Sequence, residues 1–166
     1  MSRLFIFLLV INVALPNPVE GGKEVEETLS PTNTLGVHSS ATGKFKAILR
    51  QNAMGGGVDL FVMKKNTPLF HAADVNSIVW IKDCLIYAAG PLYGPSGVFW
   101  YNASLEQISA LRPGKDNEYF ELKVVKPKER KLEYVYSSEV SNLDVDRLRA
   151  SPEAVQTLEL HSCDRQ

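Results

Sequence analysis

Two neighbouring strands that are apolar on both faces constrain this chain more than any other feature. Residues 79–102 read VWIKDCLIYAAGPLYGPSGVFWYN, so two apolar runs flank a Gly/Pro-rich link. In the second run, Val98 and Trp100 point to one face and Phe99 and Tyr101 to the other, because side chains alternate along a strand. A strand that is apolar on both faces belongs between two covering layers. The sequence therefore predicts more than one layer of β-structure.

Short apolar or alternating runs predict further strands on either side of this segment. The expected strands cover residues 44–51, 58–63, 69–72, 77–81, 84–89, 98–103, 106–111, 119–125 and 131–137. Lys82-Asp83 is a two-residue link of the kind that joins hairpin strands. The expected fold class is therefore mainly β, with antiparallel sheets.

The C-terminal end has a different pattern. Residues 142–149 carry two leucines between acidic and basic residues, which predicts one or two helical turns. Ser151-Pro152 is a second helix-start signal, with Ser as the cap and Pro as the first helical residue. Residues 153–160 fit a helix or a strand. A short helical segment is thus expected to end the β domain.

The N-terminus has the pattern of a secretion signal. Arg3 precedes a twelve-residue run, 4–15, that only Asn12 interrupts. That run is shorter than the roughly 20 residues that span a bilayer, and small residues follow it. We expect a cleaved signal peptide at 1–21, a flexible linker at 22–42 and a single β domain at 43–166. The protein would then be secreted or periplasmic, with no stable membrane span after cleavage; the alternative is an uncleaved anchor helix.

An internal repeat organises the predicted strands. Residues 57–62 align with residues 97–102 at an offset of 40, and a third copy begins at 131–136. A second strand and a Gly-rich loop precede each of the first two copies. A period near 40 residues with about four short strands per unit is typical of the blades of β-propellers.

One repeat resembles a known family. Residues 56–90, GGVDLFVMKKNTPLFHAADVNSIVWIKDCLIYAAG, look like a repeat of the TolB-like β-propellers. The matching positions are residues 59–63, then Trp80, then Asp83 before Leu85. Residues 81–84 replace the Ser-Pro-Asp-Gly turn of that family, and the second copy lacks the Trp. The resemblance implies propeller-blade-like sheets and a protein that acts by contact with other proteins.

The number of repeats leaves the closure of the core open. About two and a half units are too few to complete a ring of the usual four to eight blades. The chain could form a sandwich or a twisted sheet capped by its C-terminal segment. It could instead assemble with copies of itself as a homo-oligomer, or leave a face for a partner.

Few residues point to catalysis or metal binding. His71 with Asp74 could form a hydrolase-like site if Ser96 came close. Ser96 lies in a Gly-bounded loop, but it lacks the strand–turn–helix context of a serine nucleophile. No Cys or His pair has the spacing of metal ligands. We therefore expect no catalytic residue, no metal and no cofactor, and the hydrolase-like enzyme is kept as an alternative.

The loop at residues 90–97, GPLYGPSG, is the most suggestive binding feature. Stiff Gly/Pro loops that present an aromatic side chain suit contact with a ligand or partner. The expected binding residues are Leu92, Tyr93 and Ser96 in or near this loop, and Trp100 on the next strand. The alternative is a long link whose Tyr93 folds back on the sheet.

These features favour a secreted or periplasmic, non-catalytic protein that binds another protein or a small ligand. A structural subunit of an envelope assembly is a further alternative. The net charge of −1 gives no field that would attract nucleic acid, so no nucleic-acid partner is expected.

The two cysteines, Cys84 and Cys163, form a candidate disulfide. In an oxidising compartment a cysteine pair is commonly bridged, and this bridge would pin the C-terminal tail to the strand at Cys84. The alternative is a buried, unpaired Cys84 and a free thiol in the tail.

Overall fold

In the part of the chain that the structure describes, three four-stranded antiparallel sheets make up the fold. The computed structural model describes residues 27–28, 36–52 and 56–160. The N-terminal sheet contains β2 (Val37–Ser39), β3 (Phe45–Gln51), β4 (Val58–Lys64) and β5 (Thr67–Ala72). The middle sheet contains β6 (Val75–Ile81), β7 (Cys84–Ala89), β8 (Gly97–Asn102) and β9 (Gln107–Pro113). The C-terminal sheet has the order β1 (Glu27–Thr28), β10 (Tyr119–Lys126), β11 (Lys131–Ser137) and β12 (Val155–Glu159).

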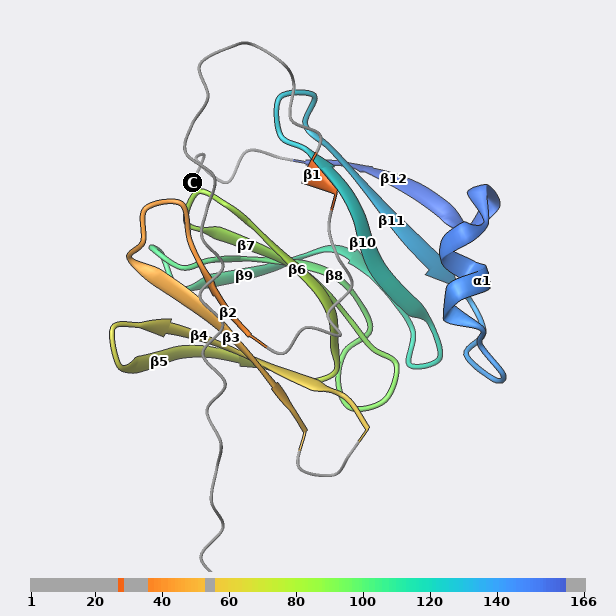
Figure 1. Cartoon of the computed structure of the whole chain (residues 1–166), viewed down its shortest axis with the longest axis horizontal. Helices are drawn as coiled ribbons and strands as arrows, with labels where there is room; N and C mark the ends of the chain where they lie inside the picture. Colours follow the sequence, from red (N-terminus) through yellow and green to blue (C-terminus); the bar gives the residue numbers. More distant parts are fainter. Residues whose placement is uncertain (1–26, 29–35, 53–55, 161–166) are drawn as a thin grey trace, which may run out of the picture.

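The middle sheet lies between the other two, as Figure 1 shows. All six residues of β7 are buried. Leu85 and Tyr87 belong to a core shared with the N-terminal sheet. Ile86 and Ala88 face the other way, into a core shared with the C-terminal sheet. The prediction of two covering layers and the mainly β fold class are both confirmed.

The 40-residue offset aligns strands that hold equivalent places. Residues 57–62 fall on β4 and residues 97–102 on β8, which are each the third strand of a four-stranded order. The third copy, at 131–136, falls on β11, which is again the third strand of its sheet. The sequence repeat thus corresponds to a structural repeat of the sheets.

Tight links close the hairpins. Ile81 pairs with Cys84, so Lys82-Asp83 is the two-residue link that the sequence predicts. Lys82 has a φ of 55°, and Lys65, Glu106 and Arg130 have nearly the same value in the links after β4, β8 and β10. Positive φ at such links matches the right-handed twist of the strands that they join.

The C-terminal segment combines a short helix with a strand. Asp144 caps helix α1 (Val145–Ala150) by accepting from the backbone N–H of Arg147 at 3.1 Å. This cap explains why the helix starts at Val145 rather than at residue 142. A 3₁₀ turn, η1 (Pro152–Ala154), then leads into β12, which pairs with β11. Residues 155–159 are therefore a strand, which resolves the choice that the sequence left open.

Backbone pairing extends toward the N-terminus into the range expected to be a linker. Val37–Ser39 form β2 against β3, and Glu27–Thr28 form β1 against β10. Backbone hydrogen bonds hold these short strands in place. They contain too few apolar residues to show a period in the sequence, so the sequence analysis did not predict them. The predicted signal peptide, 1–21, lies outside the described residues. Among the described residues, no helix has the length and apolar character needed to cross a membrane.

Buried tyrosines predict a loss of stability at high pH. Burial raises the pKa of Tyr87, and burial together with the hydrogen bond to Glu121 raises that of Tyr119, above the ordinary 10.0. As the pH rises, these two tyrosines therefore lose their protons at a lower pH in the unfolded chain than in the folded protein. The free energy of unfolding should thus fall as the pH rises above about 10. Urea unfolding from about pH 8 to about pH 11 would measure the slope. Tyr87→Phe should reduce it, and an unchanged slope would contradict the assignment.

Candidate functional site

A cleft of about 520 Å³ opens where one end of each sheet comes together. Its walls come from the β3–β4 link, the β5–β6 turn, the 90–97 loop, the start of β10 and the segment before α1. The lining residues are Gln51, Gly56, Gly57, Val58, Asp74, Val75, Asn76, Pro91, Leu92, Tyr119, Val140 and Leu143. All three sheets thus contribute to one concave surface.

The lining combines apolar walls with acceptor groups. The apolar side chains are Val58, Val75, Pro91, Leu92, Val140 and Leu143, and the polar ones are Gln51, Asp74, Asn76 and Tyr119. Among the described residues, the lining contains a carboxylate and no Lys, Arg or His. A cleft of this composition suits an apolar or cationic group better than an anion.

Asp74 ties the 90–97 loop to the turn between β5 and β6. Its carboxylate accepts from the backbone N–H of Leu92 and, at 3.3 Å, from that of Tyr93. Its own carbonyl accepts from the N–H of Gly90 at 2.8 Å. Asp74 adopts a φ of 56°, which Asp tolerates better than most residues. The loop is therefore anchored at its start, with Leu92 held at the cleft.

Asp74 is a buried residue, at 3% exposure. Burial raises its pKa above the usual 3.8; the charge of Asp59 adds to this, and the two backbone N–H groups oppose it. The folded state therefore holds this proton more tightly than the unfolded chain does. The stabilisation from that difference is present below pH 3.8 and is lost as the pH rises through the folded-state pKa.

Replacement of Asp74 should separate its acceptor role from its charge. Asp74→Ala leaves two amides without their acceptor, so we expect a loss of about 1–3 kcal/mol of stability and faster hydrogen exchange at Leu92 and Tyr93. Asp74→Asn keeps an acceptor oxygen, tolerates the positive φ and removes the buried charge. At neutral pH we expect it to match the unmodified protein. Equal exchange rates in the two variants would contradict the anchoring role.

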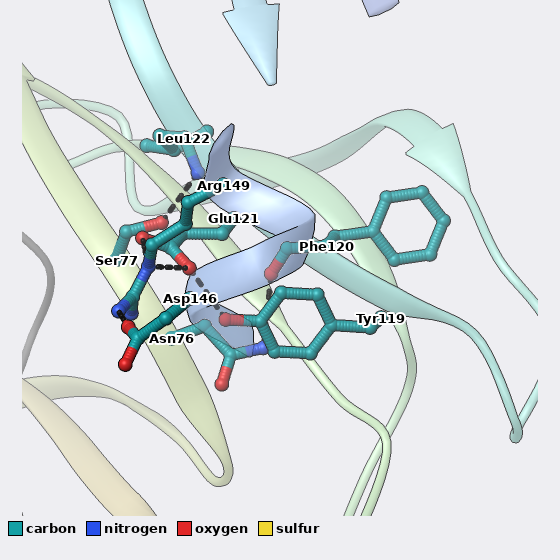
Figure 2. Close-up of polar contacts among 8 residues, drawn as sticks. All are labelled: Asn76, Ser77, Tyr119, Phe120, Glu121, Leu122, Asp146 and Arg149. Carbon is teal, nitrogen blue, oxygen red and sulfur yellow. Dashed lines mark hydrogen bonds and ion pairs between the residues drawn. The ribbon is translucent and has the colours of Figure 1, made fainter. Parts of the chain in front are cut away.

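A partly buried ion pair holds α1 against the C-terminal sheet (Figure 2). The Nε of Arg149 donates to both carboxylate oxygens of Glu121, at 3.0 and 3.1 Å. The hydroxyl of Tyr119 donates to the same carboxylate at 2.5 Å. Arg149 also contacts Asp146 on its own helix at 3.1 Å. Because Tyr119 lines the cleft and Leu143 lies just before α1, this network supports one side of the cleft.

Polar side chains of β6 join the middle sheet to β10, as Figure 2 also shows. The amide of Asn76 donates to the carbonyl of Phe120 at 2.9 Å and to that of Gly90 at 2.6 Å. The hydroxyl of Ser77 accepts from the N–H of Leu122 at 2.7 Å. Asn76 thus links the base of the 90–97 loop to the C-terminal sheet, behind the cleft wall.

The four predicted binding residues differ in their exposure to solvent. Leu92 is 59% exposed and lines the cleft, and Tyr93 is 44% exposed beside Gly56. Ser96 is buried, and its hydroxyl has no hydrogen-bond partner in the described part of the chain. Trp100 packs, partly buried, against the core between the middle and C-terminal sheets. Only Leu92 and Tyr93 are therefore placed to meet a partner at the surface.

The hydrolase-like alternative would need His71, Asp74 and Ser96 together. His71 instead stacks on Phe61, with ring centroids 4.7 Å apart, and its Nε2 lies 3.9 Å from the carboxylate of Asp59. Asp74 accepts from the loop amides, as described above. Among the described residues, no hydrogen bond joins any two of the three. The described residues also contain no group of three or more His, Cys, Asp or Glu side chains arranged to hold a metal.

Cys84 is buried at the start of β7 and is disulfide-bonded. The expected partner, Cys163, lies outside the described residues. The pairing of Cys84 with Cys163 therefore stays a prediction.

The sequence analysis missed Glu121 and Arg149, which do not line the cleft but hold the lining residue Tyr119 and helix α1 in place. Glu121 lies in a strand where a charge usually marks a solvent-facing position, yet it is 4% exposed. The signal that could have found it is the acidic side chain within the apolar run YFELKVV, which requires a buried partner. Nothing in the sequence points from there to Arg149.

Comparison of the chain with protein-family models, with curated proteins and with solved structures gives no match.

Proposed function

We propose that this protein is a secreted or periplasmic, non-catalytic binding protein that takes another protein or a small ligand at the cleft. The observation that carries the proposal is the position of Leu92, which lines the cleft and is 59% exposed on an anchored loop. A rigid apolar side chain at the mouth of a preformed cleft is a typical contact for a partner. The TolB-like resemblance, with its implied protein contacts, points in the same direction.

The chemistry of the lining narrows the class of ligand. The walls offer apolar contact, and Asp74 offers the negative charge among the lining residues. A group with an apolar stem and a positive end, such as a lysine side chain of a partner or a small aliphatic amine, would match both features. An anion would meet a carboxylate and, among the described lining residues, no compensating base.

A pair of probes with the same carbon chain and opposite charge tests this class. We expect n-butylammonium to shift the backbone NMR signals of Asp74, Asn76 and Leu92, because its tail contacts the apolar wall and its charge faces the carboxylate. Butyrate at the same concentration should produce smaller shifts at these residues. Equal shifts, or shifts spread over the whole surface, would contradict the proposal.

A variant that fills the cleft supplies the control. Gln51 lines the cleft at the exposed end of β3, so Gln51→Trp should obstruct it and abolish the shifts from n-butylammonium. Lys46 lies on the same strand, is also exposed and is not a lining residue. Lys46→Trp should leave the shifts unchanged. Persistence of the shifts in Gln51→Trp would place the binding elsewhere.

A further inference from the structure

Strand β9 is an open edge of the middle sheet. Within the described part of the chain it pairs with β8 on one side, and no strand pairs with its other side. Its first four residues, Gln107, Ile108, Ser109 and Ala110, are all exposed. Because successive side chains point to opposite faces, four exposed residues in a row mean that both faces are open here. Ile108 is 51% exposed, although it is a large apolar residue.

The first part of β9 lacks the devices that usually block pairing at an edge, and these occur at its end, at Arg112 and Pro113. Natural edge strands are protected by charged residues, by proline, by bulges or by short length. Residues 107–111 carry no charge and no proline, and the register shift of β9 falls at its far end, after Ala110. Within the described part of the chain, this regular, neutral stretch therefore presents unpaired backbone N–H and C=O groups on its outer side.

The other edges of the three sheets are better protected. β5 contains Pro68 and a register shift. β2 has three residues, and β1 has two. β6, at the opposite edge of the middle sheet, lies against β10 and β4. β12 has five residues and ends at the exposed Glu159. The start of β9, residues 107–110, is thus an edge with no charge, no proline and no bulge, and all four residues are exposed.

We propose that β9 pairs antiparallel with β9 of a second copy of this chain and so joins two middle sheets into one. With the two-fold axis at Ser109, Ile108 lies opposite Ala110 of the partner subunit. Both residues lie on the face toward the N-terminal sheet, because their β8 partners Tyr101 and Phe99 belong to that core. A large apolar side chain then meets a small one on the same face, twice by symmetry.

Charge also favours a second copy as the occupant. The chain has a net charge of −1, so two copies repel each other weakly. The paired stretch is itself neutral, and the two-fold axis places each Ile108 opposite Ala110 of the partner subunit. One isologous contact satisfies the open edge of both subunits and leaves no further edge of β9 for continued growth.

Light scattering behind a sizing column tests the proposal. The unmodified full chain should have twice the mass of one chain. Ile108→Lys with Ala110→Lys places four like charges at the junction and should reduce the mass to that of one chain. Leu105→Lys is the matched control, because Leu105 is 47% exposed in the preceding turn and outside the strand. A monomeric unmodified chain, or a dimer that persists in the double variant, would overturn the proposal.

A cysteine at the axis tests the register. Directly opposite residues of antiparallel strands have Cα atoms about 4.5–5.5 Å apart, which is within disulfide range. Ser109→Cys should therefore form a covalent dimer under mild oxidation. Thr157→Cys, at an exposed position of β12, should not. A dimer in solution that Ser109→Cys fails to cross-link would show that another surface joins the copies. The outcome is independent of the cleft, which lies at the ends of the sheets.

Discussion

Replacing Leu85 or Ile86 by Ala should destabilise the protein by about 2–5 kcal/mol in each case. The two residues are neighbours on β7, with exposed fractions of 0% and 3%, and they point into different cores. In a sheet with one solvated face, one of two adjacent residues would tolerate truncation. Because the middle sheet is covered on both faces, each truncation leaves a cavity that the packed neighbours cannot fill. Urea denaturation of the two variants would measure both losses.

A control with a similar change of volume comes from the surface. Leu92→Ala removes the same atoms as Leu85→Ala, but at a residue that is 59% exposed. Its effect should stay within about 0.5 kcal/mol, as for ordinary surface substitutions. A large loss for Leu85→Ala with a surface-like effect for Ile86→Ala would mean that the C-terminal sheet does not cover β7 in solution.

The layered arrangement of the sheets could be predicted because it follows from the pattern of apolar residues within short segments of the sequence. The apolar runs around Lys82-Asp83 and after Gly97 indicate strands buried on both faces, and the structure places both in the middle sheet. The 40-residue offset likewise matches equivalent strands of successive sheets. Hairpins connect neighbours in sequence, so residue-level periodicity carries most of the information about such sheets. The choice for residues 155–159 stayed open because a five-residue segment fits either period.

The cleft could not be predicted, since it depends on contacts between distant segments. Leu92 and Tyr93 were expected at a binding surface from the loop composition alone, and their exposure is consistent with that. Ser96 was expected with them, but its side chain turns inward beside Gly90, at a distance that excludes any side chain there. The residues that fix the loop and the wall, Asp74 and Glu121, act through partners 18 to 28 positions away. No short motif encodes such pairs.

Arg149→Met should cost about 2–3 kcal/mol of stability, toward the low end for a broken buried ion pair because the Arg149 side chain is 30% exposed. The methionine retains most of the apolar stem. Among the described residues, the Glu121 carboxylate, 5% exposed in its side chain, then keeps the hydroxyl of Tyr119 as its one hydrogen-bond partner. The remaining charge is buried without a cation, and that is the main source of the loss. Chemical denaturation would measure it.

Two further variants separate the pair from the helix. Arg147 lies on the same helix and is exposed, so Arg147→Met should change the stability little. Glu121→Met combined with Arg149→Met removes both charges, and it should recover much of the loss because an apolar pair of similar volume needs no desolvated charge. If the double variant were as unstable as Arg149→Met, the loss would come from packing of the arginine stem instead. The contact of α1 with the sheet, and with it the Leu143 side of the cleft, would then depend on shape rather than on charge.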